Sequence, residues 1–310
     1  MRRYKVSIIG AGMVGATTAQ CIAQRDIANV VLIDIVGDVA AGKALDIFEA
    51  SPLCSFHGTM EGGDDYILTK DSDVVVITAG SPRKPGMSRK DLLEINARIV
   101  TDVVKKITNQ SPDAVIIVVT NPVDALTYAA WQVSGFPRNR IMGMSGMLDS
   151  SRLKSFIASA IGVSVDDVVA MVVGAHSENH MLPLLRLANV NGIPIKEFLD
   201  EETLQNLAER TKQAGKEIVS LLKTGSAYYA PAAAITEMVE AILLDKKRLM
   251  PCSVCLEGEY GLSGCAICVP AILGKNGVER VIEINLTDEE KSQVEQGAHA
   301  VKEMLSSLEL

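Results

Sequence analysis

Two of the chain's four histidines stand in one short segment, GAHSENH, at residues 174–180. Two histidines four residues apart with an acid between them could bind zinc, whereas one histidine at the end of a strand could act as an acid–base group. A zinc-protease motif needs Glu directly after the first His and both on a helix. Here Ser177 follows His176, a β-branched run precedes it, and Pro183 follows soon after. The pattern favours His176 as an acid–base group, with His180 as an accessory loop residue and no metal site.

A second candidate site is the glycine-rich segment GAGMVG, which lies between the strand-like run KVSIIG and the helical pattern ATTAQCIAQ. Gly10 permits a tight turn, Gly12 lets the backbone approach a pyrophosphate at the helix N-terminus, and Gly15 allows helix and strand to pack closely. Asp34 ends the next apolar run, about 20 residues further on. Its carboxylate would accept hydrogen bonds from a ribose diol and repel a 2′-phosphate, which favours NAD over NADP. The residues predicted to bind this cofactor are Gly10, Ala11, Gly12, Met13, Val14, Gly15 and Asp34.

Composition limits the class of protein. The 310 residues, 48% of them hydrophobic, suit two domains or one large α/β domain. A net charge of −8 argues against a nucleic-acid or anionic-membrane surface, because both need a basic field. Six cysteines in a chain of this length are not a disulfide scaffold, and no long apolar run predicts a membrane span. The N-terminus resembles a signal peptide only superficially, so we expect a reduced, cytoplasmic protein.

The order of predicted elements indicates the fold. Four β-branched runs in the first half, KVSIIG, NVVLID, SDVVVITAG and DAVIIVVTNP, are typical of strands buried on both faces of a parallel sheet. Helical patterns alternate with them, which predicts a Rossmann-type doubly wound sheet over residues 1–145. Longer helices and a strand pair around a Gly-rich turn follow, and Thr287 and Glu290 form a capping box before the last helix. We expect an α+β substrate domain over residues 146–310, packed tightly on the first domain.

A basic segment, AGSPRKPGMSRKDLLEIN, follows the third buried run. Arg83 and Arg89 flank Pro85 and Gly86, so we place both arginines on a loop at the carboxyl edge of the sheet, where α/β proteins bind ligands. Such a loop could close over an anionic substrate and exclude water. A solvated basic loop is the alternative.

Several motifs together resemble one known family. IGAGMVG, VLIDI, SPRKPGMSRKDLLEIN, VVTNPVDALTY, GMLDSSRLKSFIA and LLKTGSAYYAPAAA occur in this order over nearly the whole chain. The chain is similar to the lactate/malate dehydrogenase superfamily, and within it to the malate dehydrogenases of the lactate-dehydrogenase-like type. The resemblance implies NAD-dependent, reversible oxidation of (S)-malate to oxaloacetate, a reaction of the tricarboxylic acid cycle. It also implies a homo-oligomer, with a tetramer favoured over a dimer. A lactate or other 2-hydroxy-acid dehydrogenase is the alternative within the class.

The resemblance assigns roles to an acid–base group and a carboxylate clamp. The motif LDSSR places Asp149 and Arg152 three residues apart, on one face of a helix. Arg152 would bind the C1 carboxylate of the substrate bidentately. His176 would take the hydroxyl proton, and Asp149 would orient its ring and stabilise the imidazolium. An ordinary surface ion pair is the alternative interpretation of Asp149 and Arg152.

The resemblance further implies the residues that set specificity. Arg89 would polarise the C2 oxygen of the substrate when the loop closes. Arg83 stands at the family's specificity position, where lactate enzymes have Gln. An arginine there matches a second carboxylate, because an unpaired buried carboxylate costs several kcal/mol. A dicarboxylate substrate such as malate or oxaloacetate is therefore favoured.

The remaining implied roles belong to the segment around VVTNP. Asn121 would donate a hydrogen bond to the substrate oxygen. The backbone of Val119, Thr120 and Asn121 and the side chain of Asn96 would line the nicotinamide end of the cofactor site. The family also implies a cis peptide bond before Pro122.

The segment after His176 departs from the family pattern. The family usually has Gly-Asp after its catalytic histidine and a segment one residue shorter, whereas this chain has Ser177 and Glu178. If the family glycine has positive φ, Ser177 would adopt that conformation at some cost. His57 and His299 stand near no other candidate group.

Four cysteines form two pairs, CSVC and CAIC, with a spacing typical of structural zinc sites. Both pairs lie in strand-like runs, and on an extended strand residues i and i+3 point to opposite faces. We interpret Cys252, Cys255, Cys265 and Cys268 as small buried hydrophobes, with zinc or a disulfide as alternatives. A non-catalytic NAD-binding or zinc-stabilised regulatory protein is the hypothesis from a different functional class.

Overall fold

The structure is a computed structural model that describes residues 2–81 and 88–308, without the side chain of Arg89. The helices are α1 (Met13–Gln24), α2 (Gly37–Glu49), α3 (Ser51–Cys54), α4 (Arg89–Gln110), α5 (Val123–Ser134), α6 (Gly146–Ile161), α7 (Glu201–Leu222), α8 (Tyr229–Leu243) and α9 (Asp288–Ser306). The strands are β1 (Lys5–Ile9), β2 (Asn29–Ile33), β3 (Met60–Gly63), β4 (Val74–Ile77), β5 (Val115–Val118), β6 (Ile141–Gly143), β7 (Val168–Val169), β8 (Val172–Gly174), β9 (Met181–Pro183), β10 (Asn189–Val190), β11 (Ile193–Pro194), β12 (Arg248–Glu257), β13 (Ser263–Gly274) and β14 (Gly277–Val281).

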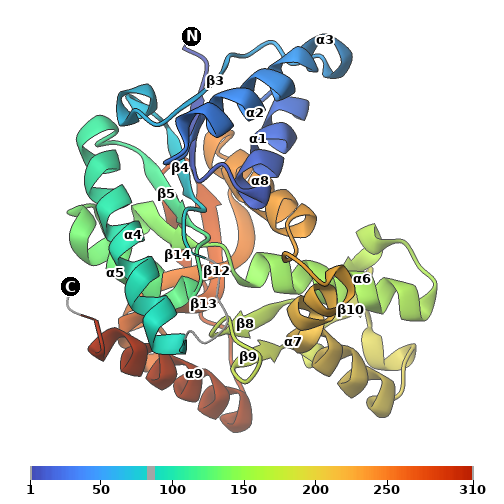
Figure 1. Cartoon of the computed structure of the whole chain (residues 1–310). Helices are drawn as coiled ribbons and strands as arrows, with labels where there is room; N and C mark the ends of the chain where they lie inside the picture. Colours follow the sequence, from blue (N-terminus) through green and yellow to red (C-terminus); the bar gives the residue numbers. More distant parts are fainter. Residues whose placement is uncertain (1, 82–87, 309–310) are drawn as a thin grey trace.

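The N-terminal half forms a parallel sheet with the strand order β3-β2-β1-β4-β5-β6. Four of these strands form where the β-branched runs predict them, and the residues of β4 and β5 are buried throughout. Helices cover both faces, because α4 packs on α5 on one side and α1 packs on α8 on the other (Figure 1). The prediction of a Rossmann-type doubly wound parallel sheet is confirmed.

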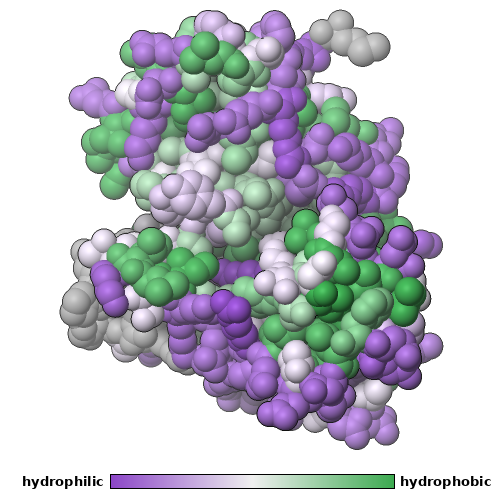
Figure 2. Space-filling view, turned by 90° about the vertical axis from the view of Figure 1, so that its right-hand side faces the viewer, coloured by the Kyte–Doolittle hydropathy of each residue, from purple (hydrophilic) through white to green (hydrophobic). Residues whose placement is uncertain are grey.

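Residues beyond 145 extend this sheet. β12 pairs antiparallel with β6, β13 pairs with β12, and β8 pairs with β13 and β9, so the described residues form one 11-stranded mixed sheet. A smaller sheet, β11-β10-β7, packs with α6 and α7 around a second core. Figure 2 shows the face that carries these elements, which is hollowed between an upper and a lower part. The two halves are thus joined through shared strands as well as packed together.

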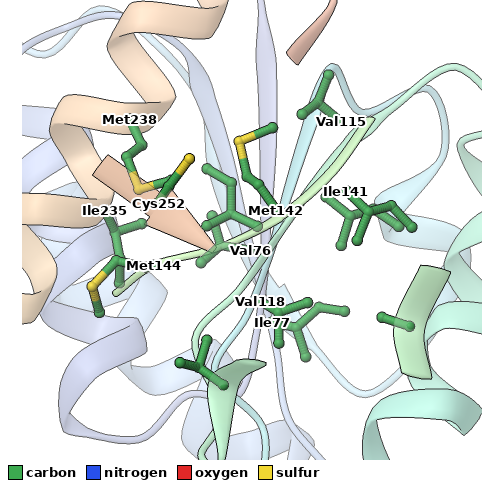
Figure 3. Packing of buried hydrophobic residues seen from close by; sticks show 14 of the residues in the cluster. Val76, Ile77, Val115, Val118, Ile141, Met142, Met144, Ile235, Met238 and Cys252 are labelled. Carbon is green, nitrogen blue, oxygen red and sulfur yellow. The ribbon is translucent and has the colours of Figure 1, made fainter. Parts of the chain in front are cut away.

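The main core spans both halves of the chain. Side chains of β4, β5 and β6, such as Val76, Val118 and Met142, pack in one cluster with Met238 of α8 and Cys252 of β12 (Figure 3). These residues have almost no exposed surface. Aliphatic and sulfur-containing side chains fill this core, as the low aromatic content predicts.

The cysteine pairs lie on the hairpin of β12 and β13. Cross-strand partners share a face of the sheet, so the pairing places Cys252 and Cys265 on one face and Cys255 and Cys268 on the other. The four thiols therefore cannot converge on one ion. All four are buried and free, and burial raises the pKa of the Cys252 thiol to about 12. Their role as small buried hydrophobes fits this packing.

The start of α4 differs from the sequence prediction, and several elements were not predicted at all. The sequence pattern predicts Arg89 on a loop, but Arg89 is the first residue of α4, because Ser88 and Asp91 form a capping box that starts the helix there. The capping box of Thr287 and Glu290 before α9 is confirmed. Sequence reasoning missed β3, β6 and α8, since two of them are very short and α8 is apolar on most sides. Among the described residues, no helix is both long and apolar enough to cross a membrane.

Gly146, the first residue of α6, makes a testable contact. A Cβ atom at this position would lie 2.3 Å from Cys268 Sγ and 2.5 Å from the backbone oxygen of Val172. Gly146→Ala should therefore lower the free energy of unfolding by about 1–3 kcal/mol through overpacking. Gly42→Ala, in α2 with open space around it, is the matched control and should raise stability by up to about 1 kcal/mol. Urea unfolding of both variants measures this, and equal stabilities would contradict the packing argument.

Candidate active site

His176 lies in the turn between β8 and β9. The backbone N–H of Ser177 donates to the oxygen of Ala175 at 2.7 Å, and the N–H of Met181 donates to the oxygen of Ser177 at 2.9 Å. Ser177 Oγ and His180 Nδ1 are 2.9 Å apart, which closes the segment on itself. The segment is thus a turn between antiparallel strands, and His180 is an accessory residue of that turn.

The expected backbone cost at Ser177 is absent. Ser177 is not among the residues with positive φ, so the strain expected of a left-handed backbone at this position is not present. The turn instead uses Gly174, whose φ is +87° and whose Cβ position lies 2.3 Å from the backbone oxygen of His180. Glu178 forms an ion pair with Lys216 of α7 and so connects the turn to that helix.

Asp149 holds the ring of His176. Its Oδ2 atom lies 2.7 Å from His176 Nδ1, and its Oδ1 atom accepts a hydrogen bond from Arg152 Nη1 at 3.1 Å. The side chains of Asp149, Arg152 and His176 are 2%, 12% and 16% exposed. When the carboxylate accepts from Nδ1, the proton sits on Nδ1 and leaves Nε2 with a free lone pair. The arrangement therefore presents a base at Nε2.

The electrostatics of the site favour a protonatable histidine. Burial disfavours the imidazolium, but the charge and hydrogen bond of Asp149 and the charge of Asp124 favour it, while Arg152 opposes it. The balance raises the pKa of His176 above its ordinary value of 6.5. Asp149 and Asp124 thus favour the protonated imidazole, a form that an acid–base catalyst must be able to reach.

Arg152 has a donor available for a ligand. Its Nε atom is buried and has no hydrogen-bond partner among the described residues. A buried donor without a partner costs free energy that an anionic ligand would recover. A guanidinium in a largely buried site is suited to bind a carboxylate through two parallel hydrogen bonds.

Sequence reasoning missed Asp124 on α5. This buried carboxyl accepts a hydrogen bond from the backbone N–H of His176, with an N–O distance of 2.6 Å. Asp124 stands within the segment VVTNPVDALTY, but its partner His176 is 52 residues further along the chain, so no local sequence pattern indicates the contact. Asp124, Asp149 and Arg152 therefore all surround His176.

The glycine loop has the geometry of a dinucleotide site. A Cβ at Gly10, where φ is +107°, would lie 2.7 Å from the backbone nitrogen of Ala79. A Cβ at Gly15 would lie 1.9 Å from the backbone oxygen of Gly10, so helix and loop touch here. At Gly12 a Cβ would meet nothing within 4 Å, and this open space borders the N-terminus of α1. The three glycines fit the turn, ligand-approach and packing roles predicted for them.

Asp34 closes the same loop. Its Oδ2 accepts from the N–H of Ala11 at 2.7 Å, and its Oδ1 accepts from the N–H of Val36 at 3.1 Å. Lys43 of α2, which sequence reasoning missed, donates from Nζ to the oxygen of Ala11 at 2.6 Å. Met13 and Val14 begin the first turn of α1. The structure thus brings the predicted loop residues and Asp34 together.

The segments after β4 and β5 meet at Asn96 of α4. Its Oδ1 accepts from the N–H of Ser81 at 2.7 Å, and its Nδ2 donates to the oxygen of Asn121 at 2.8 Å. Thr120 Oγ1 donates to the oxygen of Ala79 at 2.7 Å. The Asn121–Pro122 peptide bond is cis, as the family resemblance implies. Val119 to Asn121 thus lie at the carboxyl edge of the sheet, where α/β proteins bind ligands.

Two predicted site residues, Arg83 and Arg89, lie wholly or partly outside the described part of the chain. Arg83 lies outside the described residues. The backbone of Arg89 starts α4, and its side chain lies outside the described part of the chain. Among the described residues, no group of three or more His, Cys, Asp and Glu side chains could hold a metal ion.

A dinucleotide loop at one sheet edge and a buried acid–base pair with an adjacent guanidinium define an NAD-dependent oxidoreductase. Comparison with known families agrees. The NAD-binding domain of the lactate/malate dehydrogenase family matches residues 4–143, and the family's α/β C-terminal domain matches residues 146–309. The chain belongs to the lactate/malate dehydrogenase family, and its cofactor is NAD.

Individual relatives are similar over their full length. A malate dehydrogenase of Roseiflexus castenholzii is 52% identical over 306 residues, with 99% of each chain covered. The solved malate dehydrogenase of Picrophilus torridus is 42% identical, with a TM-score of 0.96 over 98% of this chain and 97% of that one. A lactate dehydrogenase of Cryptosporidium parvum, solved with lactic acid and nicotinamide adenine dinucleotide, is 38% identical, with a TM-score of 0.95 over 99% and 98%.

Proposed function

We propose that the chain oxidises (S)-malate to oxaloacetate reversibly, with His176 as the proton acceptor. The observation that carries this proposal is the buried contact of Asp149 with both His176 and Arg152. Oxidation of a 2-hydroxy acid needs a base for the hydroxyl proton and a clamp for the neighbouring carboxylate. One short segment of α6 provides both the clamp and the carboxylate that orients the base.

The residues of the chain would divide the work as follows. Arg152 binds the C1 carboxylate and orients the hydroxyl of C2 toward His176 Nε2. His176 accepts the hydroxyl proton, and Asp149 stabilises the imidazolium that forms. Asn121 and Arg89 hydrogen-bond the C2 oxygen, and Asp34 binds the ribose diol. Bound NAD supplies the hydride acceptor at its nicotinamide ring.

Specificity for malate rests on Arg83. An arginine at this position can pair with the second carboxylate of malate, which lactate lacks. Full-length relatives with about half of their residues identical are malate dehydrogenases, which supports the dicarboxylate. Oxidation of lactate is the second candidate, because several similar structures are lactate dehydrogenases. Comparison of oxaloacetate with pyruvate as substrate discriminates between the two.

The context of the enzyme is also part of the proposal. We place it in the cytoplasm and in the tricarboxylic acid cycle, and the free cysteines are consistent with a reducing compartment. We favour a homotetramer over a dimer. Exposed apolar side chains support self-association: Leu221 at the end of α7 is 74% exposed, and Leu53 of α3 and Tyr229 of α8 are also exposed. Apolar patches on the face that carries α7 and α8 are visible in Figure 2.

Replacement of the proposed base is the most direct test by mutation. His176→Asn should lower kcat for oxaloacetate reduction by about 100- to 10,000-fold, because general acid–base catalysis is lost. NADH binding, measured by fluorescence titration, should stay nearly intact. His299→Asn on α9, where the side chain is 75% exposed, is the control and should keep wild-type turnover. Full activity of the His176 variant would exclude its role as the base.

Replacement of Arg83 tests the substrate class. Arg83→Gln should reduce the preference for oxaloacetate over pyruvate, expressed as a ratio of kcat/KM values, by about 100-fold or more, because the distal carboxylate loses its partner. Lys84→Gln removes a neighbouring charge of the same sign and should leave the ratio nearly unchanged. An unchanged ratio in the Arg83 variant would show that another residue sets specificity.

A further inference from the structure

The Asp124 carboxyl is buried beneath the turn that carries His176. It lies in the first turn of α5, two residues after Pro122 of the cis Asn121–Pro122 bond. Its Oδ2 atom accepts from the backbone N–H of His176 at 2.6 Å, while its Oδ1 atom has no hydrogen-bond partner among the described residues. Ser253 of β12 lies beside the carboxyl. A buried carboxyl with one unpaired oxygen destabilises the folded protein. Its presence here is explained if its hydrogen bond to the amide of His176 serves the function of that histidine.

The contact fixes the direction of the catalytic side chain. Because the N–H of Ser177 is already bonded to the oxygen of Ala175, the backbone on both sides of His176 is held. The ring is held separately by Asp149 from α6. His176 is therefore anchored at its backbone by one helix and at its imidazole by another. A shift of about 1 Å in such a base can cost about 100-fold in rate.

Asp124 also contributes charge. The charged groups that face the imidazole are Asp149 and Arg152 of α6 and Asp124 of α5. On β13 the thiols of Cys265 and Cys268 are near enough to Asp124 for charges to interact, but burial raises the pKa of both thiols and keeps them neutral. Burial raises the pKa of the Asp124 carboxyl, while the hydrogen bond from the His176 amide and the charge of His176 oppose that rise. The positive charge of protonated His176 thus stabilises the ionised form of Asp124, and the negative charge of ionised Asp124 stabilises the protonated form of His176.

We propose that Asp124 is a positioning residue for His176, which holds the backbone of the turn through its amide and places a second buried carboxyl beside the imidazole. The inference rests on the proposed role of His176 as proton acceptor. Asp124 belongs to α5, whose start adjoins Asn121 at the carboxyl edge of the sheet. It therefore ties the base to the segment that is proposed to line the nicotinamide site.

A titration of the imidazoles by nuclear magnetic resonance tests the charge effect without turnover. The chain has four histidines, so the His176 signal can be assigned by its loss in His176→Gln. Asp124→Asn should lower the pKa of His176 by about one pH unit, because one acidic neighbour is removed. Asp113→Asn removes a charge from an exposed side chain and should leave that pKa unchanged. The imidazole of His57 is the internal control in every sample.

Steady-state kinetics tests the backbone contact. Asp124→Ala should lower kcat by about 10- to 100-fold with little change in KM for NADH, and Asp124→Asn should recover most of the loss, because its amide oxygen still accepts the N–H of His176. An unchanged His176 pKa in Asp124→Asn, wild-type turnover in Asp124→Ala, or an Asn variant as slow as the Ala variant would each overturn the proposal.

Two further outcomes remain decisive. If Asp124→Ala does not fold, the titration of Asp124→Asn decides on its own. If the wild-type protein does not reduce oxaloacetate, the proposed function fails, while the titration still shows whether Asp124 acts on His176.

Discussion

The site depends on a single buried carboxylate, that of Asp149. A carboxylate with 2% of its side chain exposed is stable only if its oxygens are paired, and here one oxygen faces His176 and the other faces Arg152. The same pairing selects the His176 tautomer that leaves Nε2 free and orients the guanidinium that would hold a substrate carboxylate. Without the carboxylate of Asp149, neither the imidazole of His176 nor the guanidinium of Arg152 would be held in place. Acid–base chemistry and substrate binding therefore both depend on this carboxylate.

The fold supports this carboxylate from several directions. Gly146, the first residue of α6, lies so close to Cys268 and to Val172 of β8 that a Cβ atom there would overlap both, so the start of the helix that carries Asp149 packs directly on β8. His176 follows β8 in a turn that begins with the positive φ of Gly174, and this turn places the histidine beside Asp149. The strands of the second half continue the Rossmann sheet, so the cofactor edge and the acid–base pair are built on one continuous sheet.

Features with a local pattern could be predicted from the sequence, and features made by distant contacts could not. The β-branched runs, the glycine spacing before α1 and the Thr287 capping box each arise from neighbouring residues, and the structure has them where they were predicted. The pairing of His176 with Asp149 was accessible only through the family resemblance, because 27 residues separate them. Asp124 was missed for the same reason. At Arg89 the loop expectation rested on Pro85 and Gly86 and did not take into account the local capping box of Ser88 and Asp91 that starts α4.

The pH dependence of kcat/KM in the two directions tests the central claim most directly. If His176, held by Asp149, is the acid–base group, malate oxidation needs it neutral and oxaloacetate reduction needs it protonated. The raised pKa of His176 then predicts that kcat/KM for malate rises with pH through an apparent pKa above 6.5, while kcat/KM for oxaloacetate falls through that range. Profiles that change in the same direction for both substrates, or a malate profile that does not depend on pH, would contradict the account.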